Sequence, residues 1–484
     1  MTTILFLCIL STPRRGKNAP PLIDIGGGIF PLLGLINTFG RFGANPVQFI
    51  RDSYETYGTV FTLPLLHLNF TFLLGPDAEL TFYDERDDEI LSQNEPYKFM
   101  TPIFGKGIVF DAPHAVKREQ LRFIKHALRT ESFKGYVPII AEETERFFKN
   151  TKLWGNEEEG EIDLLTAMAR LTIQTATRCL LGEELSKQYG GEVADLLHDI
   201  DEGITPLAII NPNLPTAAFR RRDAARAKFA QIFGSIIAQR RKNQKNGAPV
   251  PEDMLQSFME ATYTMGELKG KNLSDDQITG MLIGVLFAGQ HTSSISTTWT
   301  TLKILERPEL FEKVMAEQVY ALGEAGYKNT NDNAVLKVGP LSKDYTPDMD
   351  LGINKVYRMD LLHLCMREAL RMYPPLIMLM RKALKPVTVN TNKGEKYTIP
   401  AGHYVFVSPA VSMNIPRPDG AFEWPQRFDP YRYIDGRDED SMKSYAYTAF
   451  GGGTHACIGE QFGYVMIIKL LSLIYYRPYF YFYV

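Results

Sequence analysis

A glycine-rich segment near the end of the chain contains the residues with the clearest potential for chemistry. Residues 450–459 have the sequence Phe-Gly-Gly-Gly-Thr-His-Ala-Cys-Ile-Gly and precede an apolar stretch with helical spacing. Glycines let a backbone approach a flat ligand closely, and a helix N-terminus stabilises a thiolate through its dipole and amide donors. The pattern predicts that Cys457 is a thiolate ligand to iron; the alternative is a buried structural cysteine after a flexible loop.

Length and composition exclude several other classes of protein. The chain has 484 residues, of which 45% are hydrophobic and 23% charged, so it can bury a large core and is not disordered. A formal charge of -3 offers no basic field for a phosphate backbone, so no nucleic acid partner is expected. The 4 cysteines are scattered and include no CxxC pair, which indicates a reduced setting and predicts neither a disulfide framework nor a zinc site.

Apolar residues at three- and four-residue spacing predict a mainly helical protein. The expected helices cover residues 115–128, 137–152, 164–181, 217–246, 252–263, 309–325 and 355–372. The longest helix is expected to begin after Ser274, a predicted N-cap followed by two aspartates, and to continue to about Leu305. Alternating patterns predict strands at residues 58–65, 68–74, 387–391, 397–399 and 404–408. The expected fold class is therefore mainly α with small β-sheets (α+β).

Two apolar stretches lie near the N-terminus. Residues 4–10 are shorter than the roughly 20 residues that a spanning helix needs, and we interpret them as the trimmed end of a membrane anchor or as part of a signal peptide. Residues 25–42 are interrupted by Pro31 and several glycines, which suits a segment on a bilayer surface or an ordinary packing segment. We expect residues 1–42 to be a short membrane-associated segment and residues 43–484 to be a single domain.

The order Phe-x-x-Gly-x-His-x-Cys-x-Gly in residues 450–459 resembles the heme-binding loop of the cytochrome P450 superfamily. Further signatures follow the family order upstream, so the resemblance covers most of the chain. It implies the cytochrome P450 fold, in which heme b lies between a long central helix and the cysteine-bearing loop, with Cys457 on the iron. Glu368 and Arg371 resemble the family's Glu-x-x-Arg pair, and Arg427 matches the third member of its buried Glu-Arg-Arg network.

Residues 288–293, Ala-Gly-Gln-His-Thr-Ser, fall inside the longest predicted helix and resemble the stretch that passes over the heme. Thr292 matches the residue that steadies dioxygen and its protons. His291 stands where most members have an acid, and it narrows the resemblance to the sterol 14α-demethylases. Because histidine titrates near neutrality, His291 is expected to pass protons to the oxygen site, paired with Asp201. The alternative is a packed core histidine.

Residues 97–110 resemble the substrate-contacting segment of the same branch, although Phe110 stands where many relatives carry a second tyrosine. The matches to heme-propionate partners are Tyr97, Arg118, Arg381 and His455, and each of the cations also has an ordinary surface interpretation. The expected sterol contacts, most of which would serve equally well as core, are Tyr97, Phe99, Met100, Phe104, Leu286, Phe287, Ala288, Leu376, Ile377, Met378 and Met380. A bulky ring at Phe99 is expected to disfavour a second methyl group at sterol carbon 4.

The resemblance implies a monooxygenase that removes the 14α-methyl group of a sterol in sterol biosynthesis, through three successive oxidations that consume O2. Electrons would come from NADPH through an NADPH-cytochrome reductase, since the chain has no dinucleotide-binding glycine loop of its own. A basic stripe is expected to steer that acidic donor, unless it is only a solvated face: Arg118, Arg122, Lys125 and Arg129. The resemblance also implies the cytosolic face of the endoplasmic reticulum membrane.

The end of the chain departs from the family pattern. An aromatic run at residues 475–484 follows soon after Cys457, whereas relatives continue into a strand pair that reaches the substrate pocket. We therefore expect a shortened C-terminus. Two alternative functions follow: a catalytically impaired heme or sterol-binding protein, and a heme-thiolate monooxygenase of fatty acids or foreign compounds. The intact motif residues Glu368, Arg371, Thr292 and Cys457 argue against the first alternative.

Overall fold

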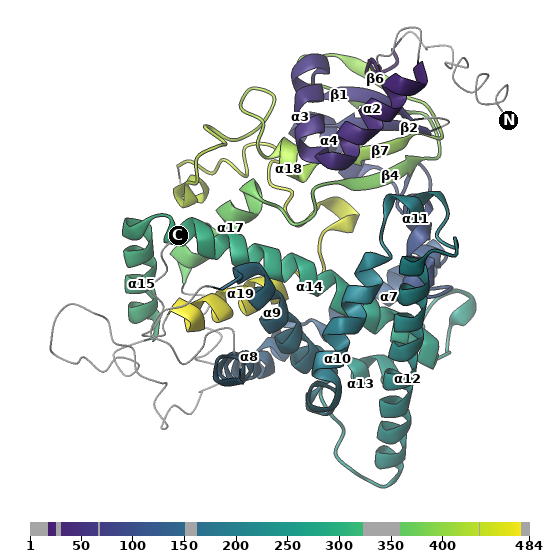
Figure 1. The fold of residues 1–484 in the computed structure, drawn as a ribbon, viewed down its shortest axis with the longest axis vertical. Helices are drawn as coiled ribbons and strands as arrows, with labels where there is room; N and C mark the ends of the chain where they lie inside the picture. Colours follow the sequence, from purple (N-terminus) through teal and green to yellow (C-terminus); the bar gives the residue numbers. More distant parts are fainter. Residues whose placement is uncertain are drawn as a thin grey trace. The chain divides into compact units, whose positions relative to one another are not determined.

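The computed structural model describes residues 18–25, 31–65, 68–150, 162–322, 359–434 and 436–475. The chain divides into two compact units (Figure 1). Unit 1 consists of Met1–Tyr97 and Leu370–Cys457, and unit 2 of Lys98–Ala369 and Ile458–Val484. Residues 4–10, part of the apolar stretch at 25–42, and the aromatic run beyond Tyr475 lie outside the described residues. The described elements confirm the expected class, mainly α with small sheets.

Unit 1 is built on a five-stranded sheet of order β1-β2-β7-β4-β3. Its strands are β1 (Val60–Leu65), β2 (Leu68–Leu73), β7 (Tyr404–Val407), β4 (Leu379–Ala383) and β3 (Leu91–Ser92), and a separate pair joins β5 (Val387–Asn390) to β6 (Lys396–Ile399). Strand β2 pairs antiparallel with β1 and parallel with β7, so the sheet joins segments that are far apart in the sequence. Figure 1 shows β1, β2, β7 and β4 side by side.

Two apolar clusters form because successive side chains of a strand point to opposite faces. Val60 and Leu73 face each other across β1 and β2 and join the cluster that contains Phe82 of α4. Phe61 and Phe72, one residue along, join the cluster that contains residues of α3. The helices of unit 1 are α2 (Pro31–Ala44), α3 (Pro46–Tyr57), α4 (Pro76–Asp84), α5 (Asn94–Tyr97) and α18 (Pro409–Ser412). Alternation in the sequence thus specifies a sheet with core on both faces.

Unit 2 is helical and is organised around α14 (Asp275–Leu305). Ser274 and Gln277 form a capping box at its start, which confirms the predicted N-cap. The other helices are α6 (Thr101–Phe104), α7 (His114–Ala127), α8 (Thr130–Asn150), α9 (Leu164–Leu181), α10 (Glu183–Glu202), α11 (Pro206–Ile210), α12 (Ala217–Lys245), α13 (Met254–Glu260), α15 (Pro308–Leu322) and α19 (Glu460–Tyr475). Helix α17 (Asp360–Met372) begins in unit 2 and ends in unit 1.

Two features of the α14 sequence determine how the helix packs: a glycine at its contact with α6, and a run of buried serines and threonines. At Gly280 a side chain would place its Cβ 1.8 Å from the Phe104 carbonyl oxygen, so glycine is what allows α6 to approach. Further along, buried hydroxyls donate to the carbonyl four residues earlier, as Thr297 does to Ser293 at 2.7 Å and Thr301 to Thr297 at 2.8 Å. The helix can therefore bury many serines and threonines without leaving them unsatisfied.

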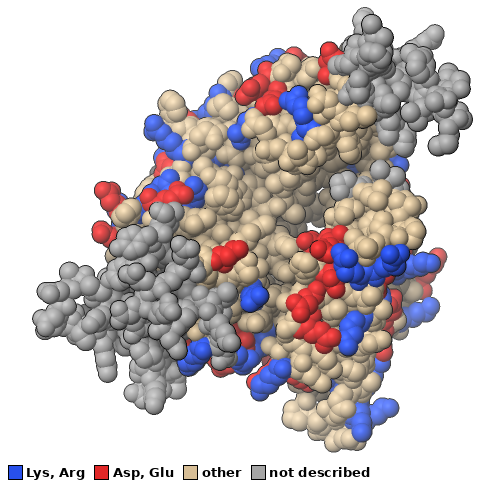
Figure 2. Space-filling view, viewed as in Figure 1, with Lys and Arg blue, Asp and Glu red and all other residues tan. Residues whose placement is uncertain are grey.

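The charge distribution on the surface and the character of the helices are relevant to the expected partners, a reductase and a membrane. On the face shown in Figure 2, Lys and Arg lie among Asp and Glu, so the described part of this face carries no broad field of one sign. Among the described residues, no helix combines the length and apolar character needed to cross a bilayer.

One buried carboxyl group in unit 1 makes stability depend on pH. Glu79 of α4 is fully buried and accepts a hydrogen bond from the Ser412 hydroxyl through Oε1. Its Oε2 has no hydrogen-bond partner within the described residues. Burial raises the pKa of Glu79 from 4.5 to about 8, and the hydrogen bond from Ser412 opposes that shift only in part.

Because the folded pKa of Glu79 lies above its unfolded value, its contribution to stability is complete below about pH 4.5 and is lost as pH rises through about 8. We expect Glu79→Gln, which stays neutral, to gain stability relative to the native protein by about 1.4 kcal/mol per pH unit between these limits. Denaturant unfolding at several pH values tests this. Glu89→Gln, at an exposed position beside Arg86, should leave the pH profile unchanged; equal profiles for all three proteins would contradict the burial argument.

Candidate functional site

The cysteine loop is held in shape by its own backbone and by close packing against unit 1. The Cys457 N–H donates to the Phe450 carbonyl at 2.8 Å and closes the loop. Gly453 has φ +58°, and a Cβ there would lie 2.3 Å from the Tyr83 carbonyl oxygen of α4. The loop therefore needs glycine for both conformation and approach. It leaves Cys457 exposed, three residues before α19 begins.

The exposure of Cys457 separates it from the other described cysteines. Cys179 and Cys365 are buried, and burial raises the pKa of both thiols, so neither is available as a thiolate. The alternative of a buried structural cysteine at position 457 is therefore wrong. An exposed thiol on a rigid glycine loop has the chemistry of an iron ligand.

Three of the predicted propionate partners lie in unit 1. Arg381 of β4 is 1% exposed and donates to the carbonyls of Phe82 and Glu85 at the end of α4, the latter at 2.9 Å. Its Nε and the Nε2 of His455 are buried without a hydrogen-bond partner within the described residues. Two buried donors of this kind suit an anionic group. Tyr97 is half-buried, and although a hydrogen bond with the Met380 backbone opposes the effect, burial raises the pKa of its phenol.

These observations fit a heme group. Cys457 supplies an exposed sulfur, and Arg381 and His455 supply donors that a propionate would satisfy. Cys457 and His455 come from the glycine loop and Arg381 from β4, so the group of side chains depends on the fold and not on one loop alone.

The predicted fourth partner, Arg118, lies in unit 2, and its contact with a propionate stays a prediction. It is exposed on α7 with Arg122 and Lys125, and Arg129 is exposed just beyond the end of the helix, so the basic stripe lies at the surface and its role in steering a donor stays a prediction. The buried cation of α7 is Lys117, which is 3% exposed and lies 5.5 Å from the centre of the Phe110 ring. The two neighbours point to different sides because successive helical residues are about 100° apart.

The middle of α14 contains the predicted oxygen-site residues. Thr292 is half-buried, and its Oγ1 donates to the Ala288 carbonyl at 2.6 Å. The His291 Nε2 lies 3.5 Å from Oδ2 of Asp201, the next-to-last residue of α10, so the expected pair is brought together. Nε2 itself is buried without a hydrogen-bond partner in the described structure, although 43% of the side chain is exposed. The packed-core alternative for this histidine is therefore wrong.

The predicted sterol contacts divide between exposed and buried positions. In unit 2, Ala288 is exposed and Phe99 and Phe287 are half-buried, whereas Met100, Phe104 and Leu286 are core residues. In unit 1, Leu376 is 54% exposed and Ile377, Met378 and Met380 are half-buried. The exposed and half-buried residues of both units can contact a ligand. Phe104 instead packs against α14 at Gly280 and Gly284.

The buried arginine network of unit 1 requires a correction. Arg427 is exposed and lies 5.2 Å from the Trp424 ring, so it is not the buried member that the sequence predicted. Arg432, which is 1% exposed, takes that place: it binds Glu439 at 2.7 Å and shares the Phe422 ring with Arg371. The two motifs Pro-x-Arg at 425–427 and 430–432 are alike in sequence, and only the chain path distinguishes them.

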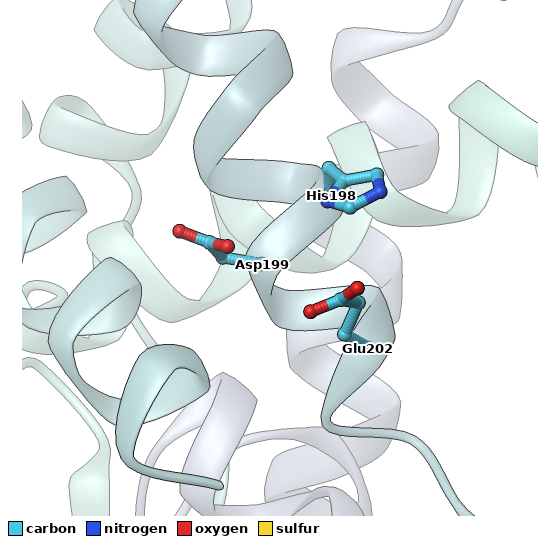
Figure 3. Close-up of side chains that lie close together, drawn as sticks. All are labelled: His198, Asp199 and Glu202. Carbon is cyan, nitrogen blue, oxygen red and sulfur yellow. The ribbon is translucent and has the colours of Figure 1, made fainter. Parts of the chain in front are cut away.

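A cluster with metal-ligand side chains lies elsewhere, on α10. His198, Asp199 and Glu202 project from the last turns of the helix (Figure 3), and their ligand atoms are within 4.8 Å of one another. Arg221 of α12 already forms an ion pair with Glu202 and lies 3.9 Å from Asp199. The hydrogen bond from Arg221 holds the pKa of Glu202 below its ordinary value. A guanidinium thus neutralises the cluster, which carries no assignment as a metal site.

Fold and site together define a heme-thiolate enzyme, and comparison with known proteins agrees. The Cytochrome P450 family model matches residues 26–475, so the chain belongs to the cytochrome P450 family. A retinoic acid-bound cyanobacterial CYP120A1 structure shares the fold with a TM-score of 0.73 and 18% identity, over 95% of this chain and 91% of that one.

More similar relatives narrow the class to a P450 monooxygenase like the sterol 14-demethylases. The chain is 39% identical to the sterol 14-demethylase of Arabidopsis thaliana, over 97% of this chain and 87% of the relative. It is 37% identical to the obtusifoliol 14-alpha demethylase of Sorghum bicolor, over 96% and 86%. The lanosterol 14-alpha demethylase of Mus musculus is 36% identical, over 94% and 81%.

The corrected arginine assignment can be tested directly. We expect Arg432→Gln to lower the free energy of unfolding by about 3 kcal/mol, because it removes the buried cation that pairs with Glu439 and leaves only the more exposed Arg437 beside that carboxylate. Arg427→Gln removes an exposed contact with Trp424 and should cost less than about 1 kcal/mol. Denaturant titration of both variants decides the matter. Equal losses, or a larger loss for Arg427→Gln, would restore the original assignment.

Proposed function

We propose that this P450 monooxygenase removes the 14α-methyl group of a sterol, using O2 and electrons that a partner reductase takes from NADPH. The observation that carries the proposal is 39% identity to a sterol 14-demethylase over 97% of the chain. Other relatives of similar identity are demethylases of obtusifoliol and lanosterol. Their names favour a role in sterol biosynthesis, and we further propose the cytosolic face of the endoplasmic reticulum membrane, the setting that the family resemblance of the sequence implies.

Cys457 would bind the heme iron, and heme with a thiolate ligand supplies the oxidising chemistry of this family. Tyr97, Arg381 and His455 would hold the propionates from unit 1. We assign the corresponding role on α7 to Lys117 in place of Arg118, because Lys117 is the buried cation of that helix. The exposed basic stripe on α7 is left to receive the acidic surface of the reductase.

His291 and Asp201 would handle protons. Asp201 is solvent-accessible and lies 3.5 Å from the His291 Nε2, so the pair can pass a proton from solvent towards that atom. Thr292 lies one residue further along α14, where its hydroxyl can exchange its bond to Ala288 for one to the oxygen site. Phe287 and Ala288 would present apolar surface to the rigid sterol, and Phe99 would set the preference at carbon 4.

The thiolate assignment predicts a spectroscopic result. Cys457→Ala should lose the red-shifted band of the reduced, carbon monoxide-bound protein, because no other described cysteine is exposed. Cys365→Ala, which alters a buried thiol of α17, should retain it. A native-type band in Cys457→Ala would remove the assignment. With the band established, turnover of a sterol panel, analysed for loss of the 14α-methyl group, tests the reaction itself.

The proton role predicts a separation between rate and affinity. His291→Ala should slow sterol turnover by roughly 100-fold, since a positioned proton donor is lost, while sterol affinity measured by spectral titration changes little. The turnover rate of Asp201→Asn should lie between those of His291→Ala and the native protein. The control is His198→Ala, which changes an exposed histidine of α10, the helix that also carries Asp201. An effect of His291→Ala confined to affinity would contradict the role.

A further inference from the structure

One carboxylate beside Arg381 and His455 is not among the residues that the sequence singles out. Asp87, in the turn between α4 and β3, is 8% exposed. Its Oδ1 accepts the Gln93 N–H at 2.6 Å and lies 3.4 Å from His455 Nε2 and 3.6 Å from Arg381 Nη2. Three positively polarised groups from three separate segments therefore surround a single oxygen.

Arg381 needs an anion of this kind. The guanidinium is 1% exposed, and the carbonyls of Phe82 and Glu85 satisfy donors without neutralising its charge. A buried charge is costly unless it is paired. Burial lowers the pKa of Arg381 to about 10, and the charge of Asp87 is the largest effect opposing that shift.

The contacts leave the donors available. Neither Arg381 Nε nor His455 Nε2 has a hydrogen-bond partner in the described part of the chain, and both are buried. The 3.4 Å and 3.6 Å separations from Asp87 are ion-pair distances without hydrogen-bond geometry. The carboxylate thus restrains the Arg381 and His455 side chains without consuming the atoms that would bind an incoming anion.

We propose that Asp87 is a positioning residue for the propionate end of the heme, holding Arg381 and His455 side by side with Nε and Nε2 presented to the propionates. The proposal rests on the heme-thiolate function proposed above. With heme bound, the fixed negative charge of Asp87 would also stabilise the more oxidised iron, because a nearby negative charge disfavours the addition of an electron. Asp87 therefore affects both how long heme is retained and how readily its iron is reduced.

The test compares Asp87→Asn with Asp88→Asn. The first keeps an acceptor for the Gln93 N–H and removes the charge; the second makes the same change at the next, exposed residue, which lies 3.9 Å from Arg86. In the purified holoprotein, transfer of heme to apomyoglobin should be about 10-fold faster for Asp87→Asn, and its iron reduction potential should be more positive. Asp88→Asn should match the native protein in both, and Asp87→Glu should restore the potential towards the native value.

Outcomes separate this proposal from the proposed function. A native protein without the thiolate-type carbon monoxide band would overturn the function itself. Native heme transfer and potential in an Asp87→Asn protein that keeps this band would overturn the positioning role alone. If Asp87→Asn does not fold, the double variant with Arg381→Gln decides: positioning predicts that it folds and loses heme no faster than Arg381→Gln, and a further increase or renewed failure to fold contradicts the proposal.

Discussion

Buried guanidinium groups are the constraint on which unit 1 depends. Arg371 donates to the carbonyls of Met413 and Pro425 at 2.8 and 2.6 Å, and Arg432 to those of Glu423 and Arg427 at 3.1 and 3.2 Å. These carbonyls belong to a stretch with little helix or sheet, where backbone oxygens lack their usual partners. Side-chain donors replace the missing backbone bonds, so the stretch is ordered without regular secondary structure.

The same principle connects the fold to the cysteine loop. Arg381 binds the carbonyls at the end of α4, and α4 in turn supplies Tyr83, whose carbonyl and ring lie against Gly453 and Gly452. The position of Cys457 is thus fixed through a sheet strand, a helix and a glycine loop in sequence. A change in any one of them reaches the sulfur through packing and not through a direct contact.

Much of this architecture could be predicted from local pattern, because the decisive forces were local. The capping box at Ser274, the alternation in β1 and β2, and the glycine loop each follow from neighbouring residues. Helix α10 could not be predicted in this way, since Gly190 and Gly191 interrupt its helical pattern and tertiary packing must compensate for them. The choices between Arg118 and Lys117, and between Arg427 and Arg432, depend on helix phase and chain path. The sequence likewise does not indicate a role for Asp87, because the partners of this carboxylate come from distant segments of the chain.

The order of strands in the sheet of unit 1 has a consequence for how the protein is made. Strand β2 pairs with β1 at once, but its other neighbour, β7, lies more than three hundred residues later by its number in the chain. All of the unit 2 helices except α19 leave the ribosome between the two strands. During synthesis the β1–β2 hairpin therefore keeps an open apolar edge, the feature that chaperones bind and that promotes aggregation. The final yield of folded protein depends on protecting that edge until β7 is made.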